Sequence, residues 1–174
     1  MQKMIESGWY LEDVMFKVGD LAVYPAHGVG RIECVESKEI GGKKQDFYIM
    51  RMMENDMKIM IPIQNAEAVG LRQLIADAEI PKVYSILQTR KICVDGATWN
   101  RRYREYMEKI KTGSIYELAE VLRDLCLLKV DKDLSFGERK MLDTARNLLV
   151  REISISQGVS EDKVEQDIFQ ILTH

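Results

Sequence analysis

Residues 41–52, which read GGKKQDFYIMRM, place a turn directly before a strand and so decide the class of the N-terminal fold. Paired glycines are a hairpin signal, because a tight two-residue turn needs positive φ angles that glycine adopts readily. Residues 47–52 are aromatic, branched or sulfur-containing apart from Arg51, a composition that suits a strand. The pattern therefore predicts a β-hairpin in which residues 47–52 pair with the strand before Gly41.

Further strand patterns flank this hairpin on both sides. An apolar run stops at Pro25, and another ends at Pro62. Apolar and polar residues alternate from Val29 to Val35. The candidates for the inner face are Val29, either Ile32 or Glu33, and Val35. Four or five short strands without a helical period favour a small antiparallel barrel of the SH3-like or Tudor-like type. The expected strands are 21–24, 29–35, 47–52 and 57–61.

The apolar spacing changes to a helical period after Gly70. Ser114 and Ser135 each stand three residues before a glutamate, which is the capping-box pattern, and Ser160 is a further expected N-cap. Leu118, Val121, Leu122 and Leu125 form one apolar stripe, and Met141, Leu142, Ala145, Leu148 and Leu149 form a second. The expected helices run from 81 to 87, from 98 to 111, and onward from 114, 135 and 160.

Strands first and helices second indicate an α+β chain of two domains. We expect a Tudor-like domain over residues 16–72, a linker over 73–80 and a helical domain over 81–174. Residues 1–15 lie before the periodic pattern and are expected to be a disordered extension.

Composition narrows the function classes. The formal net charge is −3, so any basic surface has to be local. The cysteines Cys34, Cys93 and Cys126 are far apart, which fits neither a disulfide framework nor a zinc site and favours a reduced cytoplasm. No run approaches the roughly 18 apolar residues of a membrane-spanning helix. His27 has no neighbouring nucleophile in the sequence, and the other histidine, His174, is the last residue of the chain, so we expect no enzyme, no cofactor and no small-molecule ligand.

The segment 99–104, WNRRYR, carries the strongest functional signal. It sets an aromatic side chain beside three guanidinium groups, a combination that suits the backbone and groove of a nucleic acid. Acidic residues are the ones favoured in the first turn of a helix, yet Arg101 and Arg102 stand there, and Arg139 and Lys140 repeat the pattern later. The alternative is that Trp99 anchors its helix in the core and the arginines are merely solvated.

Several motifs, taken in order, resemble the CarD/CdnL family of bacterial transcription regulators. The resemblance extends from about Phe16 to past Arg151, and the motifs are specific only in combination. The chain lacks the basic tail of the longer CarD proteins and so resembles the short, CdnL-like form. The motifs are FKVGD at 16–20, YPAHGVG at 24–30, IPIQNA at 61–66, VGLR at 69–72, WNRRY at 99–103 and LSFGERKML at 134–142.

This resemblance implies a function with two halves. The Tudor-like domain would bind the RNA polymerase β subunit, in the region of Lys38, Glu39, Ile40 and Met60. The helical domain would contact promoter DNA in the minor groove at the upstream edge of the bubble, with little sequence specificity, and so stabilise the open complex. Its implied DNA-binding residues are Trp99 as a wedge and Arg101, Arg102, Arg104, Arg139 and Lys140 as basic neighbours.

Two alternatives come from other classes. One is a coupling-factor-like module, since the same β-binding domain recruits a motor in transcription-repair coupling ATPases; the chain itself has no Walker motif. The other is a protein-interaction adaptor without direct DNA contact. The exposure of Trp99 separates the adaptor from the DNA-contacting protein.

Overall fold

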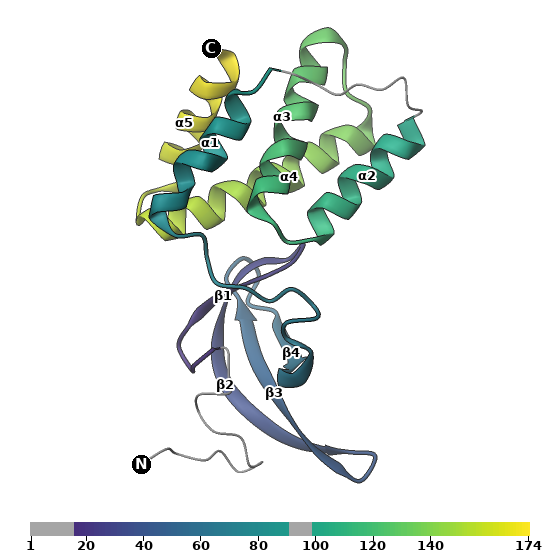
Figure 1. The fold of residues 1–174 in the computed structure, drawn as a ribbon, viewed down its shortest axis with the longest axis vertical. Coiled ribbons are helices and arrows are strands. Elements are labelled where there is room, and N and C mark those ends of the chain that lie inside the picture. Colours follow the sequence, from purple (N-terminus) through teal and green to yellow (C-terminus); the bar gives the residue numbers. More distant parts are fainter. Residues whose placement is uncertain (1–15, 91–98) are drawn as a thin grey trace. The chain divides into compact units, whose positions relative to one another are not determined.

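A computed structural model of the chain describes residues 16–90 and 99–174. These form two compact units, with the boundary between Leu74 and Ile75. The first unit consists of strands and the second mainly of helices, so the predicted α+β class is confirmed (Figure 1). Two expectations, the extension over 1–15 and the start of a helix at residue 98, lie outside the described residues.

The first unit is a curled antiparallel sheet with the strand order β1-β2-β3-β4 (Figure 1). Each strand pairs with the next one along the chain, as expected of successive hairpins. The turn between β2 and β3 is made by Gly41 at φ 60° and Gly42 at φ 79°, which confirms the predicted hairpin. The strands are β1 Leu21–Tyr24, β2 Gly28–Ile40, β3 Lys43–Met52 and β4 Lys58–Pro62.

A β-bulge in β2 resolves the competition for the inner face of that strand. The pairing register shifts between Ile32, which lies opposite Met50, and Cys34, which lies opposite Ile49. The extra residue, Glu33, lets the alternation restart one position later. Ile32 and Val35 therefore both contact the core, whereas strict alternation would have turned one of them outward.

Tyr48 and Met50 of β3 are fully buried at the centre of the strand unit. Phe16 closes one side of this core, since its backbone N–H donates to the Tyr48 hydroxyl at 3.1 Å and the two rings meet edge to face. Gly30 lets β2 approach closely, because a Cβ at this position would lie 2.6 Å from Cε of Met50. The small sheet thus encloses one apolar core with little free space around Gly30.

Five α-helices follow in the described residues, and two short 3₁₀ turns, η2 Ile63–Asn65 and η3 Asp77–Glu79, precede the first of them. Pro81 stands in the first turn of α1, where its missing N–H costs no hydrogen bond. No helix of the described residues is long and apolar enough to cross a membrane. The helices are α1 Ile80–Gln88, α2 Trp99–Lys111, α3 Ile115–Asp131, α4 Phe136–Gln157 and α5 Glu161–Thr173.

Of the three N-caps predicted from the sequence, at Ser114, Ser135 and Ser160, the structure confirms the last two. Ser135 accepts from the Glu138 N–H at 3.2 Å, and the Glu138 carboxylate accepts from the Ser135 N–H at 2.8 Å, so this capping box is confirmed. Ser160 likewise caps α5 by accepting from the Lys163 N–H.

The capping box predicted at Ser114 is wrong, although α3 does begin after that residue. The Ser114 side chain makes no capping hydrogen bond. The preceding Thr112 is the cause: its hydroxyl donates to the Glu117 carboxylate and accepts the Ser114 N–H at 3.3 Å. Thr112 thus occupies the Ser114 N–H and the Glu117 carboxylate, which one of the two capping-box hydrogen bonds would have joined.

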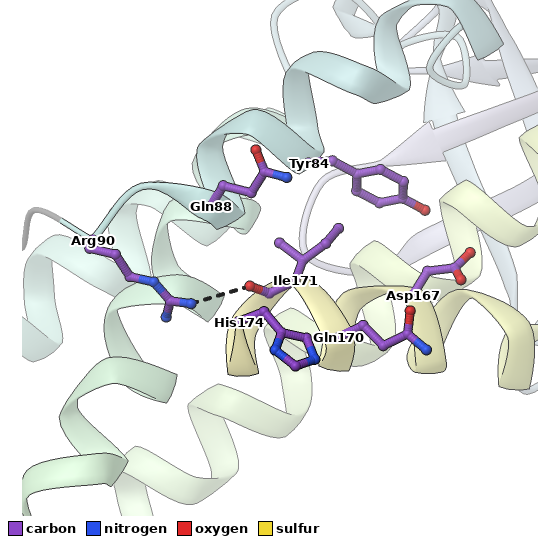
Figure 2. Close-up of a pocket in the computed structure, with 7 residues that line it drawn as sticks. All are labelled: Tyr84, Gln88, Arg90, Asp167, Gln170, Ile171 and His174. Carbon is purple, nitrogen blue, oxygen red and sulfur yellow. Dashed lines mark hydrogen bonds between the residues drawn. The ribbon is translucent and has the colours of Figure 1, made fainter.

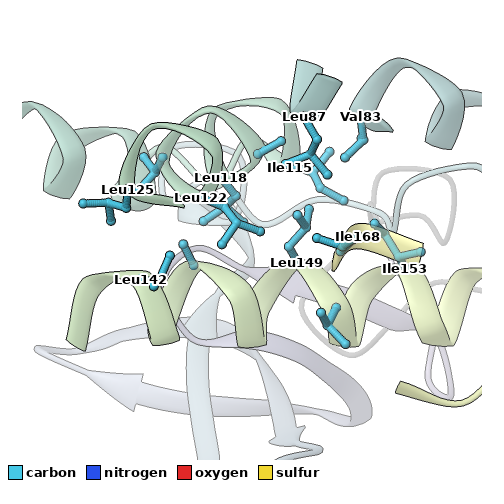
Figure 3. Packing of buried hydrophobic residues seen from close by; sticks show 14 of the residues in the cluster. Val83, Leu87, Ile115, Leu118, Leu122, Leu125, Leu142, Leu149, Ile153 and Ile168 are labelled. Atoms are coloured by element: carbon cyan, nitrogen blue, oxygen red, sulfur yellow. The ribbon is translucent and has the colours of Figure 1, made fainter. Parts of the chain in front are cut away.

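The core of the helical unit lies between α3 and α4, and α1 and α5 close it (Figure 3). Both predicted apolar stripes contribute to it, with Leu148 only partly buried. The start of this unit is held by α4, because the Ile75 N–H donates to the Glu152 carboxylate and Ser156 donates to the Ile75 carbonyl at 2.6 Å. Residues from α1, α3, α4 and α5 that meet in Figure 3 include Val83, Leu87, Leu118, Leu122, Leu125, Leu142, Leu149, Ile153 and Ile168.

Candidate functional site

Trp99 is the first residue of α2 and lies against the first turn of α4. A Cβ placed on Gly137 would lie 3.6 Å from Cζ2 of the indole, an ordinary van der Waals distance. On its own helix, Trp99 contacts Tyr103, with ring centroids 5.5 Å apart. The indole is half-buried, so it is neither a core residue nor a free side chain. The fold therefore brings the WNRRY motif at 99–103 to the motif that begins α4.

Arg139 and Lys140 extend from the turn of α4 that Trp99 contacts. Both side chains are exposed, as is Arg104 on α2. Within residues 16–90 and 99–174, none of these three cations forms an ion pair. Glu138, the acid in the same turn, is buried and already bonded to Ser135 and Lys132. The exposed charged side chains of this turn are therefore both basic.

Arg101 and Arg102 are placed differently from the other basic residues. Arg101 is exposed but paired with Glu105 one turn later, at 3.2 Å. Arg102 is half-buried, and its Nε is enclosed without a hydrogen-bond partner in the described part of the chain. Burial raises the pKa of the nearby Tyr106 to about 12, with Asp124 adding to the rise and the Arg102 charge opposing it. Arg102 thus lies on the packed side of α2.

Phe136 is a residue of this region that the sequence analysis did not single out. It is the first residue of α4 and is 77% exposed. The signal was available, because Phe136 lies on the opposite side of the helix from Ala145 and the rest of the buried stripe. The capping-box pattern that surrounds it drew attention to Ser135 and Glu138 instead.

The residues expected to bind a protein partner lie on the strand unit. Lys38 and Ile40 alternate with Glu39 along β2, so Lys38 and Ile40 share one face and Glu39 lies on the other. Met60 of β4 is on the face of Lys38, whose Nζ lies 3.6 Å from the Met60 Sδ. Ile40 is 55% exposed and Met60 42% exposed. Three of the four expected residues thus gather on one face.

Two buried residues, Phe47 and Ile49, continue this face across β3. Phe47 lies opposite Pro62, and Ile49 lies opposite Met60. The face is apolar at its centre. Glu33 at its edge is an acid whose pKa is lowered by a hydrogen bond from Arg51. We call Lys38, Ile40, Phe47, Ile49 and Met60 the outer sheet face. At one border of this face lies β4, which is an edge strand of the sheet and pairs with β3.

A shallow cavity of about 700 Å³ lies between α1 and α5 (Figure 2). Arg90 holds the end of α5 there by donating to the Leu172 carbonyl at 2.8 Å. Burial raises the pKa of Tyr84, with the Asp167 charge adding to the rise. The lining residues come from α1, from α5 and from the residues just after these helices, and they include no nucleophile paired with a base. Elsewhere in the described chain, no cluster of three or more His, Cys, Asp or Glu residues could hold a metal ion.

Comparisons with known proteins match both units. Residues 16–75 match the CarD-like/TRCF RID domain, and residues 82–169 match the C-terminal domain of CarD. The protein YdeB of Bacillus subtilis (strain 168), whose name describes it as a candidate transcription factor, is 36% identical over 154 residues, covering 87% of this chain and 98% of YdeB. This chain therefore belongs to the CarD/CdnL family, which confirms the resemblance found in its motifs.

Two solved structures from Myxococcus xanthus are similar to the N-terminal part. CdnLNt is 50% identical, covers 36% of this chain and 87% of its own, and has a TM-score of 0.32. The solution structure of the 72-residue N-terminal domain of CarD is 33% identical, covers 42% of this chain and 89% of its own, and has a TM-score of 0.30.

Proposed function

We propose that this protein is a regulator of transcription that binds the RNA polymerase β subunit and stabilises the promoter open complex. The strand unit binds polymerase through the outer sheet face, and the helical unit contacts DNA at the upstream edge of the bubble. Family membership supports a role in transcription. The contact with β, the contact with DNA and the effect on the open complex are the parts that we propose.

One observation carries the DNA half of the proposal. Trp99 rests on the turn of α4 from which Arg139 and Lys140 extend without ion-pair partners among the described residues. An aromatic ring can enter a distorted base step while neighbouring cations bind the phosphates on either side. The surface around Trp99 supplies both kinds of group within the helical unit.

The mechanism follows from tethering. A unit that is held on polymerase by another unit has a high local concentration at the promoter, so weak DNA contacts suffice. A ring that stacks only where bases are unstacked favours the open complex over the closed one, and the equilibrium shifts accordingly. Contacts to phosphates carry no sequence information, so we expect little promoter sequence preference from this unit.

Arg139 and Lys140 provide the test of this proposal. Reversing both charges (Arg139→Glu with Lys140→Glu) should shorten the lifetime of promoter complexes after a heparin challenge. The effect should weaken as salt is raised, since phosphate contacts are salt-dependent. The matched control is Lys163→Glu on α5, which reverses a charge and places a glutamate three residues after the N-cap Ser160. Equal lifetimes for the double variant and the wild type would contradict the DNA contact.

The adaptor without DNA contact remains a second candidate because Trp99 is half-buried. In that case the indole would serve mainly to hold α2 against α4. A Trp99 variant would then lose stability, and the DNA-dependent lifetime of its folded fraction would not change.

A further inference from the structure

Phe136 is a large apolar side chain that the fold leaves in solvent. It is 77% exposed at the first position of α4, where packing requires no aromatic residue. Burial of such a side chain is favourable relative to leaving it exposed. The helical unit gains little of this from Phe136, so the side chain is available to a partner.

The surroundings of Phe136 indicate the chemistry of that partner. Arg139 and Lys140 follow it by three and four residues and so lie on the same side of α4. Both are exposed, and neither has an ion-pair partner in the described residues. A Cβ added to Gly137, the next residue, would lie 3.6 Å from Cζ2 of Trp99, so the indole is close to this turn. An aromatic ring beside two free cations complements a nucleobase flanked by phosphates.

We propose that Phe136 is a stacking site for an unpaired base of single-stranded DNA next to the site of Trp99. This inference rests on the proposed function, because it assumes that this surface faces DNA. A base inside a duplex has both faces covered by its neighbours, whereas an unpaired base offers a face to an aromatic ring. Phe136 therefore distinguishes a fork with an unpaired strand from an intact duplex.

The test compares two DNAs that share one duplex sequence, one blunt and one ending in an unpaired strand with a fluorescent purine analogue. Binding by the full-length protein is measured at low salt. Phe136→Ala should weaken binding to the forked DNA about tenfold, equivalent to about 1.4 kcal/mol, and leave binding to the blunt duplex unchanged. Phe136→Tyr should retain the affinity, whereas Phe136→Leu should lose it because a branched chain has no ring face.

Phe169 supplies the matched control, because it is 66% exposed on α5 of the same unit. Phe169→Ala should bind both DNAs like the wild type, and melting curves should show every variant folded. The inference is wrong if Phe136→Leu binds like the wild type, if Phe136→Ala loses both DNAs equally, or if it loses neither.

Trp99→Ala and Arg139→Glu separate this inference from the proposed function. If these two variants weaken binding to the forked DNA and Phe136→Ala does not, only the stacking site fails. If the wild-type protein does not bind the forked DNA at all, the DNA contact fails and the stacking site fails with it.

Discussion

Trp99 is only half-buried, and this affects both the packing of α2 and the surface that is available for binding. Part of the indole is covered by Tyr103 and by the turn at Gly137. The remainder is accessible to solvent, and Arg139 and Lys140 follow Gly137 by two and three residues in α4. A side chain placed in this way contributes to packing and stays available for binding, so loss of stability and loss of binding have to be measured separately.

Gly137→Ala tests the packing part of this account. Gly137 lies in the first turn of α4, and a Cβ there would make an ordinary contact with Trp99 at 3.6 Å. Alanine is favoured over glycine in a helix by about 0.5–1 kcal/mol. We therefore expect this variant to raise the melting temperature slightly. A lowered melting temperature would show that the indole packs more tightly on α4 than the distance indicates.

Local chemistry explains which residues could be predicted from the sequence. The hairpin could be predicted from Gly41 and Gly42 because a two-residue turn requires positive φ angles whatever the rest of the fold is. The cap at Ser135 was equally local. Ser114 was predicted wrongly because Thr112, outside the four-residue pattern, competes for the same hydrogen bonds. The contact of Trp99 with Gly137 joins residues far apart in sequence, so periodicity could not reveal it.

At the scale of elements, the strand unit depends on a bulge and a glycine in β2. The bulge at Glu33 could not be predicted, because an alternating pattern is compatible with either face until the partner strand is known. The burial of Glu152 on α4 was equally hidden. A glutamate on a helix is usually solvated, but this one accepts a hydrogen bond from the Ile75 N–H where the chain enters the helical unit.

Gly30→Ala tests the close approach of β2 and β3. An added Cβ would lie 2.6 Å from Cε of Met50 and 2.9 Å from the carbonyl oxygen of Arg51. The methionine can move, but the backbone carbonyl can move only with the strand. We expect this variant to destabilise the strand unit by about 1–3 kcal/mol, a typical result of overpacking. Denaturant unfolding measures the change, and a variant as stable as the wild type would show that the strands can separate slightly.

At the scale of the whole molecule, the proposal assigns one activity to each unit. The outer sheet face and the surface around Trp99 lie on different units, so a change in one should leave the other activity intact. The division into strands and helices was predictable because the hydrophobic period changes after Gly70. The gathering of Lys38 and Met60 on one face was not, since it depends on the register of three strands.

Lys38→Glu tests the polymerase half. The reversed charge should weaken co-purification with the β subunit, because it places a carboxylate beside Met60 on the outer sheet face. The matched control is Lys44→Glu. Lys44 lies opposite Glu39 in the register of β2 and β3, and both side chains are on the other face of the sheet. Similar losses for both variants would contradict the assignment of the outer sheet face.

The central claim is that Trp99 stabilises the open complex by contacting DNA. The most direct measurement is the heparin-challenge lifetime of promoter complexes formed with Trp99→Ala, at a temperature where melting curves show the variant folded. Stacking on an unpaired base is worth about 1–3 kcal/mol, so the lifetime should fall by about fivefold or more while co-purification with β is unchanged. An unchanged lifetime for folded, polymerase-bound Trp99→Ala would contradict the claim.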